Sequence, residues 1–217
     1  MTGFLRFGVN IRAMPRKKVI NPLFEISPIE MSTVIEYQEH EVGEAFVIAL
    51  KTPKNDERFM DDHKHFTKSN INVCYAQPRT KGKSRDWFET QMSVAKSVRL
   101  QKGYPMKGMP FYAVTDDGWG FMAHTTSQNN KQFAAVGDEL ILGKWIKGRL
   151  ADAGLVKPVQ DVAKDTERLG MITSEMLESY GCNAIAFQKT DLRIEDPIVQ
   201  MNSYEIWTLK MIWIEDE

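Results

Sequence analysis

The sequence lacks several features that mark common classes of protein. Its only two cysteines, Cys74 and Cys182, are isolated, so they form neither a zinc-ligand pattern nor a disulfide framework. No apolar run approaches the length of a membrane span, and no apolar signal region follows the N-terminus. We therefore expect a cytoplasmic protein with no membrane partner. Hydrophobic residues make up 42% of the 217 positions, which is enough for a core of ordinary size.

Motifs for catalysis and for phosphate binding are also missing from the sequence. It contains no Glu-x-Lys, which completes a common metal-nuclease motif, and no His-x-Lys of the phospholipase D-like nucleases. Gly103, Gly108, Gly118 and Gly120 have the spacing of turns, not that of a nucleotide-binding loop. A Cys–His nucleophile pair is formally available, but no spacing selects one of the four histidines. We identify no catalytic residue and leave open whether the chain is an enzyme.

One charged segment holds side chains of the kind that bind metals. The run from Asp61 and Asp62 through His63 and Lys64 to His65 has four ligand-type residues in five positions. Metal sites need ligands that converge from rigid elements, and a charged loop of this kind is more often simply solvated. We therefore predict no metal site. The alternative is a complete small Mg²⁺-dependent DNA endonuclease built on Asp61, Asp62 and Lys64.

The net charge of −1 conceals a very uneven distribution of charge. Residues 1–24 carry five basic and no acidic side chains, and residues 79–149 carry twelve basic and six acidic ones. Residues 25–78 and 150–217 are acidic. A basic segment within an otherwise acidic chain is what a local site for a polyanion needs. There are two alternatives to a polyanion site. The uneven distribution is a chance fluctuation in charge, or the basic segment is a module that binds an acidic protein.

Hydrophobic patterns predict several short strands and two short helices. Asp116-Asp117-Gly118 stands between two apolar aromatic runs and predicts a hairpin turn. Asp138 can cap a helix that ends near Gly154, and Thr173 can cap a second helix that ends at Gly181. The expected strands are 44–50, 71–77, 86–94, both arms of 110–126, 183–189 and 204–214.

This series of elements favours a mainly β fold with short helices (α+β), shaped like a barrel, over a βαβ sheet. We expect residues 1–60 to be a basic N-terminal arm or linker that can include an extra strand, and residues 61–217 to form the domain.

Two polar loops carry side chains suited to nucleic acid. Arginine and lysine reach phosphates, arginine also reads guanine, and the amides of Asn and Gln pair with adenine. For either loop alone, a solvated turn is the alternative. Lys144, Lys147 and Arg149 of the following helix add backbone contacts or form its solvated face. The predicted DNA-contact residues of the two loops are Arg79, Lys81, Lys83, Arg85, Gln128, Asn129, Asn130 and Lys131.

Four segments in order then show a family resemblance: NVCYAQPR…SRDWFETQMSVAKSV, PFYAVTDDGWGF, LGKWIKGRLADAG and ITSEMLESYG…IAFQKT. They resemble the C-terminal specificity domain of type II restriction endonucleases of the phospholipase D type and related types. In these enzymes a nuclease domain is joined to a DNA-binding pseudobarrel similar to the plant B-three domain. The resemblance covers roughly residues 71–213. Its most specific pieces are 115–118 and 142–145.

The resemblance implies an open β-pseudobarrel that grips the major groove of double-stranded DNA with two loops. The N-arm falls at Gln77–Arg85, which adds Gln77 to the DNA-contact residues, and the C-arm falls at Ser127–Lys131. The implied function is sequence-specific recognition as the specificity module of a type II restriction endonuclease, with a nuclease domain or subunit as partner. The implied binding needs no cofactor, and the oligomeric state stays open. The chain departs from the pattern at Cys182, where arginine is expected, and in 156–170, which resembles an insertion.

Overall fold

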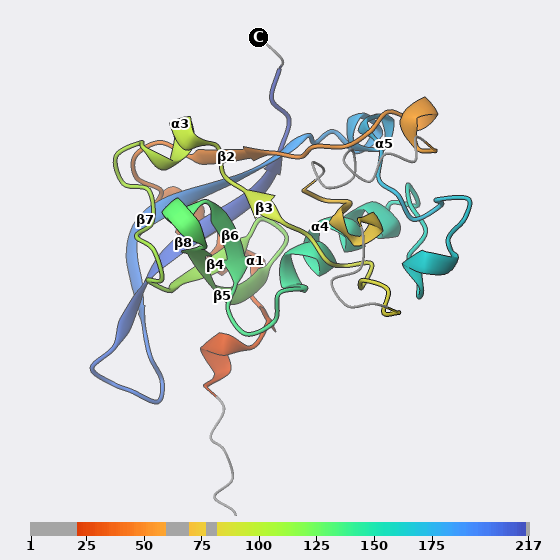
Figure 1. The fold of residues 1–217 in the computed structure, drawn as a ribbon. Coiled ribbons are helices and arrows are strands. Elements are labelled where there is room, and N and C mark those ends of the chain that lie inside the picture. The colour runs from red at the N-terminus through yellow and green to blue at the C-terminus, as the bar shows by residue number, and fades with distance from the viewer. Residues whose placement is uncertain (1–20, 60–69, 77–81, 216–217) are drawn as a thin grey trace, which may run out of the picture.

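One strongly curved β-sheet forms the body of the protein, with helices packed at one end and along one outer face (Figure 1). The computed structural model describes residues 21–59, 70–76 and 82–215. The strand order is β2-β7-β8-β4-β5-β6-β3, and β1 also pairs with β5. Neighbouring strands are antiparallel except β4 and β8, which are parallel. The path has two ends, at β2 and β3, so the sheet is an open pseudobarrel. This confirms the predicted fold class.

Most of the strands are short, and the longest two form the β7–β8 hairpin. The strands are β1 (Ser27–Pro28), β2 (Phe46–Ala49), β3 (Met92–Ser93), β4 (Phe111–Thr115), β5 (Trp119–Thr126), β6 (Gln132–Ala135), β7 (Ala184–Glu195) and β8 (Ser203–Ile212). The α-helices are α1 (Met31–Glu39), α3 (Lys96–Arg99), α4 (Ile141–Asp152) and α5 (Ser174–Tyr180). The 3₁₀ turns are η1 (Pro22–Phe24), η2 (Asn55–Glu57), η3 (Val73–Tyr75), η4 (Gln128–Asn130) and η5 (Val162–Lys164).

Aromatic side chains fill the inside of the pseudobarrel. Phe133 of β6 stacks on Phe187 of β7 with 5.0 Å between ring centroids, and Phe111 of β4 lies 5.1 Å from Trp207 of β8. Phe46 of β2 joins them, 5.4 Å from Phe187. Rings at these separations gain attraction beyond the burial of their apolar area. The cluster joins five different strands and therefore holds the curved sheet together from within.

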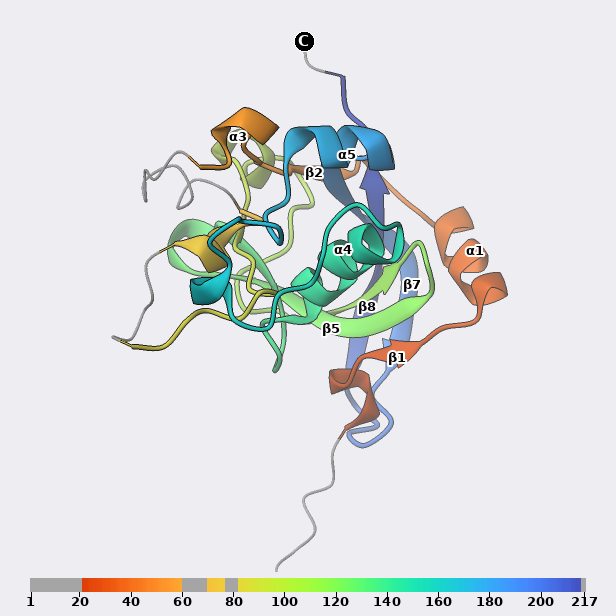
Figure 2. The ribbon, with the colours of Figure 1, turned by 90° about the vertical axis from the view of Figure 1, so that its right-hand side faces the viewer.

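A second, smaller core covers the outer face of the sheet. Val34 of α1 packs with Tyr112 and Val114 of β4, Met122 of β5 and Ile206 of β8. Figure 2 shows α1 along this flank of the sheet. Because both faces of β4 are covered, all five of its residues are buried, and only Thr115 at its end is not a hydrophobic residue.

The turn of the β4–β5 hairpin is tied to α4. Trp145 Nε1 donates to Asp117 Oδ1 at 2.9 Å. The turn is tight because Gly118 has φ +87°, and a Cβ there would lie 2.8 Å from the carbonyl oxygen of Ile29. The two pieces that carried the family resemblance most specifically, 115–118 and 142–145, therefore contact each other.

Most of the predicted elements are confirmed. The hairpin at 110–126, the helices at 138–154 and 173–181, and the strands near 44–50, 183–189 and 204–214 are all present. Gly181 ends α5 in the left-handed conformation with φ +82°. Asp138 does not cap α4 in the usual way, because its Oδ1 accepts from Leu140 N, one residue before the helix begins. Of 86–94, only the two residues of β3 are a strand.

The prediction of a strand at 71–77 is wrong for residues 71–76. Residues 71–76 are buried without alternation, and Val73–Tyr75 form the 3₁₀ turn η3. The side chain of Asn72 makes a pair of hydrogen bonds like those that a neighbouring strand would make. Its Nδ2 donates to the carbonyl of Ile172 at 2.7 Å, and its Oδ1 accepts from Ile172 N at 3.0 Å. The N-arm therefore begins at a buried turn and not at a strand.

Residues on both sides of position 60, where we placed the domain boundary, contribute to the same sheet. β1 pairs with β5, and β2 pairs with β7 over Phe46–Ala49. β2 is the extra strand expected within 1–60. Among residues 21–59, 70–76 and 82–215, no helix is long and apolar enough to cross a membrane.

Candidate nucleic-acid interface

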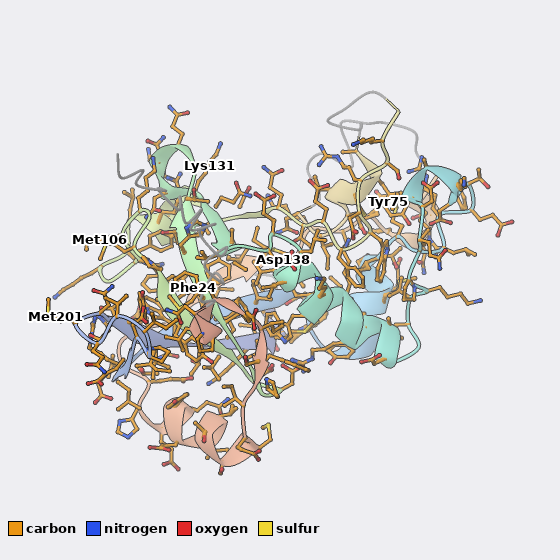
Figure 3. All side chains as sticks on the ribbon, turned by 90° about the horizontal axis from the view of Figure 1, so that it is seen from below. Phe24, Tyr75, Met106, Lys131, Asp138 and Met201 are labelled. Carbon is orange, nitrogen blue, oxygen red and sulfur yellow. The ribbon has the colours of Figure 1, made fainter. Side chains whose placement is uncertain are left out.

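The roots of the two predicted DNA-binding loops lie on the same side of the molecule. Figure 3 shows Lys131, at the end of the C-arm, and Tyr75, in the stem that leads to the N-arm, as separate projections with Asp138 between them. The C-arm connects β5 to β6. Loops from different parts of the chain thus flank a common region.

The backbone of the C-arm has a strained and well-anchored shape. Ser127, Asn129 and Asn130 have φ values of 67°, 57° and 58°. The guanidinium of Arg99 donates to the carbonyl of Asn129, and the hydroxyl of Tyr104 donates to that of Asn130 at 3.1 Å. Left-handed residues outside glycine cost free energy and persist where contacts hold them in place. The C-arm is therefore a projection anchored at its backbone by side chains from elsewhere in the fold.

Exposure divides the predicted C-arm residues into two groups. Gln128, Asn129 and Lys131 are exposed, so their polar groups are available to a ligand. Asn130 is half-buried, and its Nδ2 donates to the carbonyl of Pro105 at 2.6 Å. Asn130 therefore anchors the loop, while its three neighbours project from it.

The N-arm is described only in its second half. Gln77, Arg79 and Lys81 lie outside the described residues, as do Asp61, Asp62, His63, Lys64 and His65 of the charged segment. Lys83 is exposed. Arg85 is half-buried, and its guanidinium pairs with the carboxylate of Glu89 at 2.5 Å. Lys83 thus faces solvent, whereas Arg85 stands at the base of the arm in an ion pair.

The cations of α4 do not form one solvated face. Lys144 is exposed and pairs with Asp138 at 2.8 Å. Lys147 has 0% exposure, so the prediction that it contacts DNA or solvent is wrong. Arg149 is half-buried and binds Asp116 and Tyr180. Helical spacing alone places these residues on the helix, but only the packing around α4 shows which of them reach solvent.

A partly polar groove lies beside the root of the C-arm, and apart from Ser127 its residues were not predicted as site residues. Its lining includes Thr90 after the N-arm, Thr126 and Gln132 on either side of the C-arm, His124 of β5 and Glu139 before α4. Period-two alternation on β5 is the sequence signal that could have found the residues of this groove, because buried Ala123 and Thr125 alternate with half-buried His124 and Thr126. Burial lowers the pKa of His124 below its ordinary value, which favours the neutral imidazole.

The described residues offer little chemistry for catalysis. No group of three or more His, Cys, Asp or Glu side chains among them could hold a metal ion. Burial raises the pKa of Cys182 to about 11 and also raises the pKa of Cys74, so both thiols are held protonated. Cys182 is 1% exposed, so nothing at this position reaches a ligand.

A mainly β, nearly closed pseudobarrel with few short helices is consistent with a B3-like DNA-binding domain. The comparison with protein families agrees. The family model described as the NgoFVII C-terminal B3-like DNA-binding domain, the DNA-recognition domain of a restriction endonuclease, matches residues 36–180. The chain therefore belongs to this family and is a DNA-binding domain. The match begins earlier than the resemblance at 71–213, so it includes β2, and it ends with α5, before β7. No curated protein matches the chain.

Proposed function

We propose that this domain recognises a specific sequence of double-stranded DNA as the specificity module of a type II restriction endonuclease, gripping the major groove between the N-arm and the C-arm. The observation that carries the proposal is the C-arm. It holds Gln128, Asn129 and Lys131 exposed on an anchored backbone. Amides and amines held in fixed positions can discriminate base edges, because a displaced hydrogen bond to the wrong base is lost.

The two arms would have different tasks. Lys83, with Arg79 and Lys81, would bind phosphates and set the register of the duplex. Gln128 and Asn129 would pair with adenine edges, and Gln77 would contribute from the N-arm. Arg85 would hold the base of the N-arm through Glu89, and Lys144 would add a backbone contact.

A restriction enzyme also needs a nuclease, which we propose is a partner domain or subunit. Binding itself would need no cofactor, because cationic and amide side chains supply the contacts. Mg²⁺ enters only in the alternative of a small endonuclease built on Asp61, Asp62 and Lys64.

Site selection from random duplexes tests the proposal. We expect the wild-type domain to enrich one short motif, and we expect Gln128→Ala and Asn129→Ala to relax different positions of it. Ser179→Ala, at an exposed position of α5 outside both arms, is the matched control and should return the wild-type motif. The same motif from all variants would contradict C-arm readout.

Two further outcomes would favour the alternatives. Plasmid cleavage in Mg²⁺ that Asp62→Ala abolishes would favour the small endonuclease. Absence of binding to any duplex at low salt would favour a module that binds an acidic protein.

A further inference from the structure

Lys147 is a buried cation whose environment is not that of an ordinary core residue. It is 0% exposed, and its Nζ donates to the carbonyl of Trp87, with the carbonyl of Glu89 at 3.4 Å and the Sγ of Cys74 at 3.5 Å. The same Nζ lies 5.3 Å from the centre of the Trp87 ring. Burial disfavours the charged form of an amine, and it accordingly lowers the pKa of Lys147.

The partners of Lys147 lie on both stems of the N-arm. Cys74 belongs to η3, just before the arm, while Trp87 and Glu89 follow it. One ammonium therefore joins the chain that enters the arm to the chain that leaves it. On the leaving stem the acceptors are backbone carbonyls, which move only with the stem itself, and on the entering stem the acceptor is the buried thiol of Cys74.

The same face of α4 touches the second stem at another point. Gly143 is one turn before Lys147, and a Cβ at Gly143 would lie 1.7 Å from the carbonyl oxygen of Phe88. Only glycine permits so close an approach of helix and stem. Contact at two successive turns fixes both the distance and the direction of the stem relative to α4.

The segment 156–170 holds the stems from another direction. Tyr75 donates its hydroxyl proton to Asp165 Oδ2 at 2.5 Å, and Trp87 Nε1 donates to the carbonyl of Gly170 at 2.7 Å. Each stem is therefore bonded both to this segment and to Lys147. The segment that resembled an insertion is a support for the N-arm.

We infer that Lys147 is a positioning residue for DNA recognition, which ties both stems of the N-arm to α4 and so fixes the N-arm relative to the C-arm without touching DNA. This inference rests on the proposed function of the arms. Helix α4 is also connected to the strand that carries the C-arm. Trp145 of α4 donates to Asp117 in the turn before β5, and β5 leads directly into the C-arm.

A double-mutant cycle on DNA affinity tests the inference. Lys147→Met keeps an unbranched side chain, one atom shorter, and removes the ammonium with its three donors. We expect affinity for the selected duplex to fall about tenfold, the size of effect expected when one or two phosphate contacts are misplaced. Lys83→Ala should then cost much less in the Lys147→Met background than in wild type, whereas the cost of Asn129→Ala should be unchanged. Equal costs of Lys83→Ala in both backgrounds would overturn the inference.

Hydrogen exchange without DNA separates this inference from the proposed function. Lys147→Met should speed amide exchange in 70–76 and 82–90, and unchanged exchange in both stems would overturn the inference. If the stems loosen but neither Lys83→Ala nor Asn129→Ala affects binding by the wild-type protein, the proposed function of the arms fails. In that outcome Lys147 only supports the fold.

Two more variants guard against a general loss of stability. Val34→Ala removes methyl groups from the second core, away from the stems, and should destabilise the fold while leaving the cycle with Lys83 unchanged. Tyr75→Phe removes only the bond to Asp165 and should reproduce the effect of Lys147→Met more weakly. If Lys147→Met does not fold, Tyr75→Phe replaces it in the double-mutant cycle. Additive effects of Tyr75→Phe and Lys83→Ala on DNA affinity would then contradict the inference.

Discussion

Arg149 of α4 and Asp116 of the β4–β5 turn form an ion pair in which Nη1 of the guanidinium donates to Oδ1 of the carboxylate. The side chains are only 23% and 22% exposed. Nε of Arg149 also donates to the hydroxyl of Tyr180 in α5 at 2.9 Å. Burial raises the pKa of Asp116 although Arg149 opposes the shift. One guanidinium therefore joins the hairpin turn to two helices.

Arg149→Met should destabilise the protein by about 2 kcal/mol, because it leaves the half-buried carboxylate of Asp116 without its cation. Urea unfolding measures the loss. Adding Asp116→Asn should recover part of it, since the amide carries no charge to desolvate. Lys164→Met is the matched control, because its partner Asp161 is 3.4 Å away and Lys164 is 84% exposed. A loss for Lys164→Met as large as that for Arg149→Met would contradict this account.

Lys83→Ala should weaken DNA binding most at low salt and reduce the slope of log affinity against log salt by about 1, because one phosphate contact is lost. Fluorescence anisotropy over a salt series measures both effects. Lys210→Ala removes the same charge from a residue that pairs with Glu41, beside α1. Its slope should stay at the wild-type value, and equal changes in both variants would show that only net charge matters.

Asn130→Gly should lower the ratio of specific to non-specific affinity, because it keeps the left-handed backbone but removes the bond to the carbonyl of Pro105. Amide exchange in 127–131 should become faster. Asn129→Gly is the matched comparison: it also preserves a left-handed backbone and removes an exposed amide, so it should change base preference while exchange stays as in wild type. Unchanged exchange in Asn130→Gly would contradict the anchoring role.

Wild-type protein should lose stability relative to His124→Gln as the pH falls from 7 to 5. Burial lowers the pKa of His124 in the folded state, so the unfolded chain binds more protons between the two pKa values. The stabilisation is therefore complete above the unfolded pKa of about 6.5 and declines below it. Melting temperatures of both proteins across this range measure the difference. A constant or opposite difference would show that His124 titrates normally.

Local signals in the sequence were sufficient to predict an element where residues close to it in the chain supply its contacts. Asp-Gly at 117–118 predicted the hairpin, and apolar spacing with Gly154 predicted α4. They failed at 71–76, where Asn72 is satisfied by Ile172, 100 positions away. The strand β6 was missed because it is four residues long and begins directly after the polar C-arm. The helix α1 was not predicted either; its apolar contacts lie on the outer face of the sheet.

The candidate site shows the same division between what local sequence signals predict and what tertiary packing decides. Charge and amide content selected the C-arm, and exposure leaves Gln128, Asn129 and Lys131 available. The same reasoning could not separate Lys144 from Lys147, which lie three positions apart on one helix. It also missed the groove at His124, because the polar alternation of β5 has meaning only when a second loop faces it.

The sequence by itself determined the fold class, the turn at Gly118 and the polar composition of the two arms, because these depend on local conformation and on side-chain chemistry. Only the tertiary structure decided which charges face solvent. Lys147 contacts Cys74 and Trp87, 73 and 60 positions away. A buried ammonium and a solvated one have the same local sequence signal, and they differ only in what the rest of the chain packs around them.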